Sequence, residues 1–95
     1  MNVTVTATDF QYAPSTIRDS AGQKVRLTFI NNGKLMHEII FKGVLEAAGD
    51  ETGTKAEPGE TNGANFTAPR AGTYTFLRTI PGHKEAGMVG QLVVQ

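Results

Sequence analysis

The sequence predicts an all-β protein, a sandwich of about seven or eight short strands with little helix. Three observations support this prediction. Apolar and polar residues alternate with a period of two in several short runs, Gly, Pro or Asn residues bound these runs, and the chain has only 95 residues. Such alternation places apolar side chains on one face of a strand, and several short strands separated by turns are typical of a sandwich.

The clearest strands lie in the first third of the chain. Residues 3–8 alternate Val or Ala with Thr, and residues 24–29 alternate Val, Leu or Phe with Lys, Arg or Thr. β-Branched and aromatic residues favour strands. Asn31, Asn32 and Gly33 tolerate positive φ, so we expect the second of these strands to end there. Further strands are expected at residues 38–41, 65–67, 72–77 and 89–94.

Residues 43–60 have a different composition. They are rich in Gly, Ala, Glu and Thr and show no period of two, so we expect a long connection here. Residues 44–48 could form one helical turn, which Gly49 would end. Pro58-Gly59 predicts a turn that leads into the next strand.

Charge, cysteine content and motifs limit the possible functions. Nine basic residues balance nine acidic residues, so net charge predicts no attraction to nucleic acid. The absence of Cys excludes disulfides, zinc–thiolate sites and cysteine nucleophiles. The apolar runs are too short to cross a bilayer. The sequence has no Ser-His-Asp order with a nucleophile elbow and no phosphate-binding Gly loop, so we expect no enzymatic activity.

Chain length and the N-terminal residues bear on domain organisation and localisation. Ninety-five residues fit a single domain that spans residues 1–95. Met1 leads directly into an alternating segment without a basic or apolar leader, so we expect no signal peptide in this sequence. The mature part of an exported protein would look the same.

The C-terminal third contains the residues with the clearest potential for chemistry. His83 and Met88 lie in a segment that Pro81-Gly82 and Gly87 predict to be a tight loop, and His37 opens another strand. Two imidazoles and a thioether suit copper better than zinc, because a thioether is a soft ligand that favours Cu(I). Each residue alone has a simpler interpretation: a lone His is more often a hydrogen-bonded structural residue, and a lone Met usually belongs to the core.

The segment Thr-Ile-Pro-Gly-His-Lys-Glu-Ala-Gly-Met-Val-Gly, residues 79–90, resembles the ligand loop of the cupredoxins, the plastocyanin- and azurin-like blue-copper proteins. The resemblance extends over nearly the whole chain. It implies a cupredoxin-like Greek-key sandwich and a copper cofactor. It further implies His37 and His83 as imidazole ligands and Met88 as the weak axial ligand. The thiolate position of the family falls on Arg78.

Arg78 departs from the family pattern at the position that matters most. The Cys thiolate forms the bond that gives blue-copper sites their colour and redox couple. A guanidinium carries a permanent charge and donates no lone pair, so we expect copper to be absent or weakly bound. We also expect Arg78 to reach water or to pair with Glu38 or Glu85, because an unpaired buried charge is costly. A sharper hypothesis is an anion pocket formed by Arg78, His37 and His83.

Two functions remain open at the level of the sequence. The resemblance implies a periplasmic or extracellular electron-transfer protein, a monomer whose redox partner would dock at the His83 end, beside Ile80, Pro81 and Met88. In this chain Arg78 would disable the metal site. The alternative is a metal-free binding or structural module that uses the sandwich as a scaffold.

Overall fold

A computed structural model describes residues 1–9, 11–46, 49–78 and 88–95. No helix occurs among these residues, so none is present there that could cross a membrane. The described residues form nine strands: β1 (Asn2–Ala7), β2 (Tyr12–Ala13), β3 (Thr16–Asp19), β4 (Lys24–Asn31), β5 (His37–Leu45), β6 (Glu51–Ala56), β7 (Thr61–Thr67), β8 (Gly72–Leu77) and β9 (Val89–Val94).

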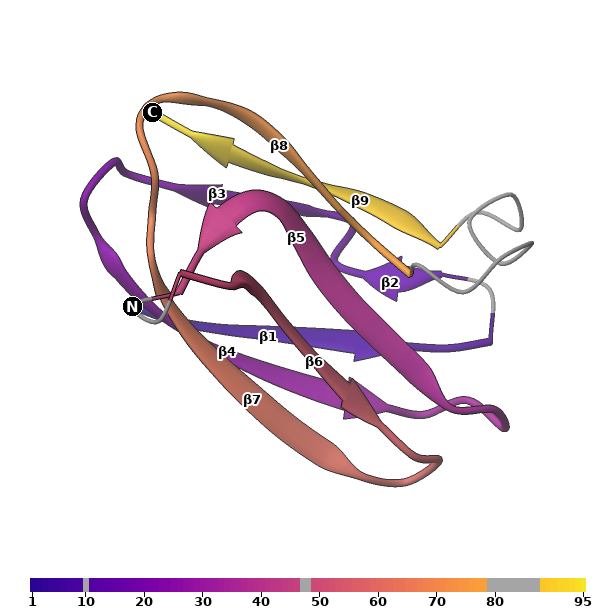
Figure 1. Ribbon diagram of the computed structural model, residues 1–95. Coiled ribbons are helices and arrows are strands. Elements are labelled where there is room, and N and C mark those ends of the chain that lie inside the picture. Colours follow the sequence, from indigo (N-terminus) through magenta and orange to yellow (C-terminus); the bar gives the residue numbers. More distant parts are fainter. Residues whose placement is uncertain (10, 47–48, 79–87) are drawn as a thin grey trace.

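The strands form two sheets that pack face to face (Figure 1). The first sheet has the strand order β2-β1-β4-β7, and the second has the order β3-β9-β8-β5-β6. β1 runs parallel to β4 and β3 runs parallel to β9, whereas the other pairs are antiparallel. Each sheet buries one face against the other, which confirms the predicted all-β sandwich.

Alternate residues of the strands fill the space between the sheets. Val25, Leu27 and Phe29 of β4 are buried, whereas Lys24 and Arg26 are exposed. This is the pattern that the period of two predicts, because successive side chains of a strand point to opposite faces.

Aromatic side chains connect the two layers. The ring centroid of Phe76 lies 5.1 Å from that of Phe41 and 5.2 Å from that of Tyr12. The ring of Tyr12 also lies 6.3 Å from that of Phe29 in β4. Tilted and edge-to-face contacts of this kind stabilise a core beyond the burial of apolar area. They fix β8 and β5 relative to the first sheet near the end of the sandwich that contains the candidate site.

The prediction of a long connection over residues 43–60 is wrong in part. β5 continues to Leu45, and β6 pairs with β5 in antiparallel register. Only Thr52 and Ala56 of β6 are buried, so this strand has no apolar face that the sequence pattern could reveal. Backbone pairing at the edge of the sheet defines β6 instead. Together with the short strands β2 and β3, β6 brings the described strands to nine, where seven or eight were expected.

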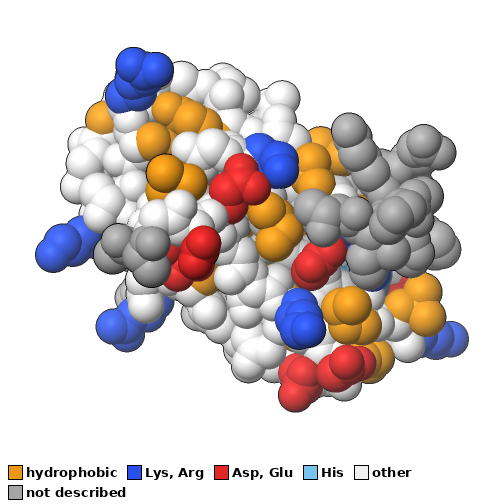
Figure 2. All heavy atoms as spheres, in the orientation of Figure 1, with side chains coloured by type: hydrophobic (Ala, Val, Ile, Leu, Met, Phe, Trp, Pro, Cys, Tyr) orange, Lys and Arg blue, Asp and Glu red, His pale blue; other side chains and the backbone are white. Residues whose placement is uncertain are grey.

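The surface carries charges of both signs. On the face shown in Figure 2, Lys and Arg side chains are interspersed with Asp and Glu side chains and with hydrophobic ones. This distribution agrees with equal numbers of basic and acidic residues in the sequence. No field of a single sign therefore covers this face.

Three chain segments meet at one end of the sandwich. β5 begins at His37, β8 ends just before Arg78, and β9 begins directly after Met88. Because β8 is antiparallel to both β5 and β9, the end of β8 lies beside the beginnings of its two neighbours. The end of β1 lies at the same end of the molecule, since β1 runs parallel to β4, and only residues 32–36 separate the end of β4 from the beginning of β5.

Candidate metal centre

The structure brings together three of the four positions that the sequence singled out. His37, Arg78 and Met88 are all buried, with 1%, 2% and 1% of their surface exposed. The backbone N–H of Arg78 donates to the carbonyl oxygen of Met88 at 3.4 Å. His83, the fourth position, lies outside the described residues.

Arg78 contacts His37 directly. Nη1 of the guanidinium lies 2.6 Å from Nδ1 of the imidazole, and this contact is buried. A guanidinium has donors but no acceptor, so Nδ1 must accept the hydrogen bond with its lone pair. The imidazole is therefore neutral, and its proton lies on Nε2. Arg78 thus fixes the tautomer of His37.

The other ring nitrogen of His37 faces Asp9. Nε2 lies 3.3 Å from Oδ1 of Asp9, and the proton on Nε2 makes this contact a hydrogen bond to the carboxylate. The same oxygen accepts the backbone N–H groups of Lys34 at 2.6 Å and Leu35 at 3.4 Å. The hydrogen bond from Lys34 is the main cause that lowers the pKa of Asp9, and the bonds from His37 and Leu35 act in the same direction.

The sequence analysis did not identify Asp9. A signal was nevertheless present, because Asp9 follows the first predicted strand directly, and a parallel pairing of that strand with residues 24–29 would place it near the segment before His37. We refer to these hydrogen-bonded side chains as the Asp9–His37–Arg78 chain.

The loop between β4 and β5 is shaped by a side chain. β4 ends at Asn31, as predicted, although none of Asn31, Asn32 and Gly33 has a positive φ. Instead, Nδ2 of Asn31 donates to the carbonyl oxygens of Leu35 at 2.8 Å and Ala56 at 2.9 Å. Its Oδ1 accepts the N–H of Gly33 at 2.8 Å. Asn31 therefore satisfies backbone groups that the irregular loop leaves without partners in a ladder.

Gly33 is required here for close packing. A Cβ atom at this position would lie 2.8 Å from Nε2 of His37 and closer still to Oδ1 of Asp9. Real Cβ atoms do not approach polar atoms so closely, so any larger residue would displace one of these two side chains.

Tyr12 adds a polar contact behind the site. Its hydroxyl donates to the carbonyl oxygen of Glu38 at 2.6 Å, and its ring packs against Phe76. Burial raises the pKa of Tyr12, although the positive charge of Arg78 acts in the opposite direction. Tyr12 therefore remains protonated and serves as a hydrogen-bond donor.

One part of the expected environment of Arg78 is wrong, and another part is not tested. We expected its charge to reach water or to pair with Glu38 or Glu85, but the side chain is only 2% exposed and its guanidinium bonds to His37. Glu85 lies outside the described residues. Nε of Arg78 is buried and has no hydrogen-bond partner among the described residues.

These residues do not fit a copper ion in the space between His37 and Arg78. Copper would need the imidazole lone pair that Arg78 occupies, and the other nitrogen of His37 carries a proton directed at Asp9. The guanidinium would also repel the ion. Over the described ranges, no group of three or more His, Cys, Asp or Glu residues is arranged to hold a metal.

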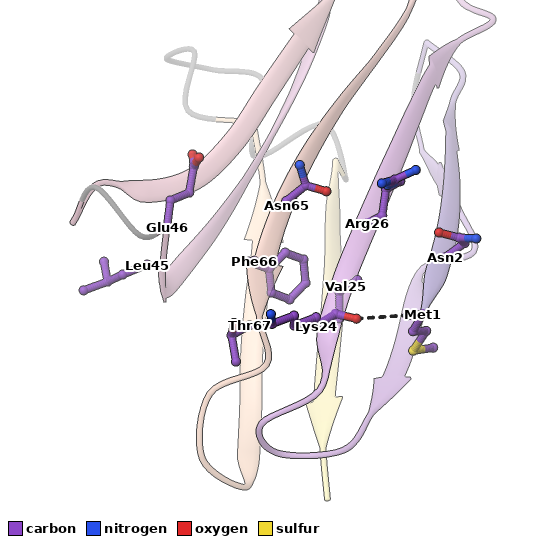
Figure 3. Close-up of a pocket in the computed structure, with 10 residues that line it drawn as sticks. All are labelled: Met1, Asn2, Lys24, Val25, Arg26, Leu45, Glu46, Asn65, Phe66 and Thr67. Atoms are coloured by element: carbon purple, nitrogen blue, oxygen red, sulfur yellow. Dashed lines mark hydrogen bonds between the residues drawn. The ribbon is translucent and has the colours of Figure 1, made fainter.

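A pocket of about 750 Å³ lies at the opposite end of the sandwich (Figure 3). It is bounded by the beginning of β4, the end of β7 and the residues that follow the end of β5. The polar side chains of Lys24, Arg26 and Glu46 accompany the apolar Phe66 in its lining. Because these strand ends are opposite to those that hold His37 and Arg78, the pocket is not part of the candidate metal centre.

Comparison with known proteins finds relatives that match along most of the chain. The family of copper binding proteins of the plastocyanin/azurin type matches residues 1–95. The copper-resistant cuproprotein CopI of Rubrivivax gelatinosus is 34% identical over 101 residues, which cover 90% of this chain and 60% of that protein. The chloroplastic plastocyanin of Chlamydomonas reinhardtii is 33% identical over 91 residues, which cover 90% of this chain and 59% of that protein. The chain thus spans about three fifths of these two relatives.

Solved structures agree with this result. A structure of auracyanin B matches with a TM-score of 0.84 and 26% sequence identity, covering 99% of this chain and 88% of that one. The sequence of this chain contains no Cys. The family match over all 95 residues nevertheless settles the assignment, and the chain belongs to the plastocyanin/azurin family of copper-binding proteins.

Proposed function

We propose that this chain is a cupredoxin whose copper site is disabled by Arg78, so that it is metal-free or binds copper only weakly. One observation carries the proposal: the guanidinium of Arg78 donates to Nδ1 of His37 at 2.6 Å inside the protein. A ligand nitrogen that accepts a hydrogen bond from Arg78 has no lone pair left for a metal.

The proposal includes the domain and the site. Residues 1–95 form a single cupredoxin-like domain, and His37, His83 and Met88 occupy the family's copper-ligand positions. Arg78 stands at the thiolate position, which in this family supplies the strongest copper bond. Met88 is buried and packs against the hydrophobic core.

The proposal extends to partners and location. Members of this family transfer single electrons rather than catalyse reactions, and we infer that this chain likewise has no enzymatic activity. A redox partner would dock at the His83 end if electron transfer were retained. We further propose that the protein is a monomer and works in the periplasm or outside the cell, as the family resemblance implies.

The test combines metal analysis with one substitution. The protein is purified without chelator, its metal content is measured, and Cu(II) is then titrated. We expect no stoichiometric copper and no intense visible absorption. Arg78→Cys should give intense visible absorption on addition of Cu(II), because it restores a thiolate beside His37. A colourless Arg78→Cys product would contradict the assignment of position 78.

Arg18→Cys is the matched control. Arg18 lies on β3 with an exposed side chain, so a Cys there has no imidazole arranged beside it. This variant should bind Cu(II) without the intense absorption. Equal absorption in both variants would show that any thiol produces the colour.

A second candidate is a metal-free binding or structural module. The Asp9–His37–Arg78 chain favours it, because hydrogen bonds within the protein join the three side chains at this end of the sandwich without a metal. Copper titration tests whether a residual metal site remains. Saturable Cu(II) binding that is lost in His37→Ala and His83→Ala would indicate such a site and count against the module, whereas no binding in the unmodified protein agrees with both candidates.

A further inference from the structure

Arg78 carries a buried charge without an anionic partner in the described part of the chain. Its side chain is 2% exposed, and no carboxylate of the described residues forms an ion pair with it. Its hydrogen-bond acceptor is the neutral imidazole of His37, which supplies a lone pair but no negative charge. Within the described ranges, no anion therefore neutralises the positive charge of Arg78 at short range.

The nearest link to an anion is indirect. Asp9 contacts Arg78 only through the ring of His37, and its Oδ1 already accepts bonds from His37, Lys34 and Leu35. A buried guanidinium normally pairs with an anion, because desolvation of an uncompensated charge is costly. The buried charge of Arg78 thus requires an anionic partner, and the described residues do not provide one.

The guanidinium leaves one edge for such a partner. Nη1 is engaged by His37, whereas Nε is buried and has no partner among the described residues. Nε and Nη2 form one side of the planar guanidinium, where two parallel N–H groups match the two oxygens of an oxyanion.

We propose that the Nε–Nη2 edge of Arg78 binds a small planar oxyanion, of the size of nitrate or formate. The inference rests on the proposed function, because the space beside His37 must be free of copper. It also replaces the hypothesis of an anion pocket formed by Arg78, His37 and His83 with a site in which Arg78 alone contacts the anion. His37 cannot donate from Nδ1, since this atom accepts from Arg78, so the guanidinium provides the anion contact. The small exposure of Arg78 excludes a bulky ligand.

The direct test follows the N–H signal of the Arg78 side chain. Protein labelled with ¹⁵N and freed of metal is titrated with sodium nitrate and with sodium formate, and sodium chloride at equal ionic strength serves as the reference. We expect a saturable shift of the Arg78 Nε–H resonance with the oxyanions and not with chloride, because a spherical ion does not match the two-donor edge. An unchanged resonance, or the same saturation with chloride, would overturn the proposal.

Thermal unfolding gives an independent readout. A ligand that binds only the folded state stabilises it by an amount that grows as the logarithm of 1 + [L]/Kd, so nitrate well above its Kd should raise the Tm of the unmodified protein by a few degrees above the chloride reference. Arg78→Lys keeps the charge but removes the planar edge, and it should abolish this difference. Arg18→Lys, on the exposed surface of β3, should retain it. A difference that persists in Arg78→Lys would contradict the assignment to Arg78.

Copper analysis on the same preparation separates this inference from the proposed function. Stoichiometric copper in the unmodified protein would refute the proposed function and the inference with it. A metal-free protein whose Arg78 signal ignores both oxyanions would refute the inference alone. Should Arg78→Lys fail to fold, the resonance of the unmodified protein still decides the question.

Discussion

Nη1 of Arg78 lies 2.6 Å from Nδ1 of His37, and this contact is buried. The two side chains come from β5 and from the end of β8, and antiparallel pairing of these strands sets their separation. Under the proposed function, a side-chain cation takes the place of the metal cation. The lone pair of the imidazole then faces a cation that belongs to the protein itself.

The hydrogen bond between Arg78 and His37 should contribute measurably to stability. His37→Leu removes the acceptor of a buried charged donor, and we expect it to lower the free energy of unfolding by about 1.5–3 kcal/mol, as for hydrogen bonds to charged groups. Urea unfolding monitored by circular dichroism would measure the change. A loss below a few tenths of a kcal/mol would mean that water replaces the imidazole.

The double variant His37→Leu with Arg78→Met tests whether the cost comes from the stranded charge. Replacing both partners by apolar side chains removes the polar groups that would otherwise be buried without partners. We therefore expect the double variant to be more stable than His37→Leu alone, with a coupling that a double-mutant cycle resolves. Additive losses would show that the two side chains act independently.

Sequence reasoning predicts the core strands and part of the site, and particular residues explain the division. β4 is predicted because Val25 and Leu27 occupy its buried face in strict alternation, whereas the pairing of β6 leaves no such pattern. His37 is found through the family resemblance. The role of Asp9 depends on the parallel pairing of β1 with β4, a long-range relationship that no local pattern reveals.

The environment of Arg78 is a second feature that depends on tertiary contacts and not on local sequence. The family resemblance assigns the permanent charge of Arg78 to the thiolate position, and charge complementarity then suggests a carboxylate partner. The structure instead provides a neutral imidazole, since the register of β5 and β8 puts Nδ1 of His37 within reach. The pattern of charges in a sequence cannot reveal a neutral acceptor such as His37, because tertiary geometry decides which acceptor lies within reach of the guanidinium.

Gly33 should be intolerant of even the smallest side chain. A Cβ atom there would meet Nε2 of His37 at 2.8 Å and Oδ1 of Asp9 at a shorter distance. We expect Gly33→Ala to lower the free energy of unfolding by about 1–3 kcal/mol, the usual range for overpacking. Chemical denaturation would measure the loss. Asp9→Ala combined with Gly33→Ala should cost less than the sum of the two single changes, because the double variant removes the closest clash.

Asn31 should contribute strongly to the free energy of unfolding. Its amide makes three hydrogen bonds to backbone groups of Gly33, Leu35 and Ala56. Asn31→Ala leaves these groups without partners, and we expect a loss of about 2–3 kcal/mol, the cost of one or two unsatisfied buried groups. Asn32→Ala, at the neighbouring exposed position, is the control and should be nearly neutral. Equal effects in the two variants would refute the proposed role of the amide.

Glu51 should make stability depend on acid. Its carboxylate accepts the N–H of Gly43 at 2.9 Å and an N–H of Lys42 at 3.1 Å, and the hydrogen bond from Gly43 is the main cause that lowers its pKa. A pKa that is lower in the folded than in the unfolded state means that folding favours the ionised form. The resulting stability is complete above the ordinary pKa of 4.5 and is lost as the pH falls through the lower folded value.

Glu51→Gln isolates this contribution. The amide cannot ionise, so the variant should be less stable than the unmodified protein at pH 7, and the difference should shrink as the pH falls below 4.5. Urea unfolding at a series of pH values would measure it. Both hydrogen bonds lie at the surface, where salt screens the attraction between the charges of Lys42 and Glu51. High salt should therefore reduce the contribution of Lys42 to the stability difference, whereas the contribution of the Gly43 N–H should persist. A difference that stays constant from pH 7 to pH 3 would show that the charge of Glu51 does not matter, and that the side chain acts only as a neutral hydrogen-bond acceptor for β5.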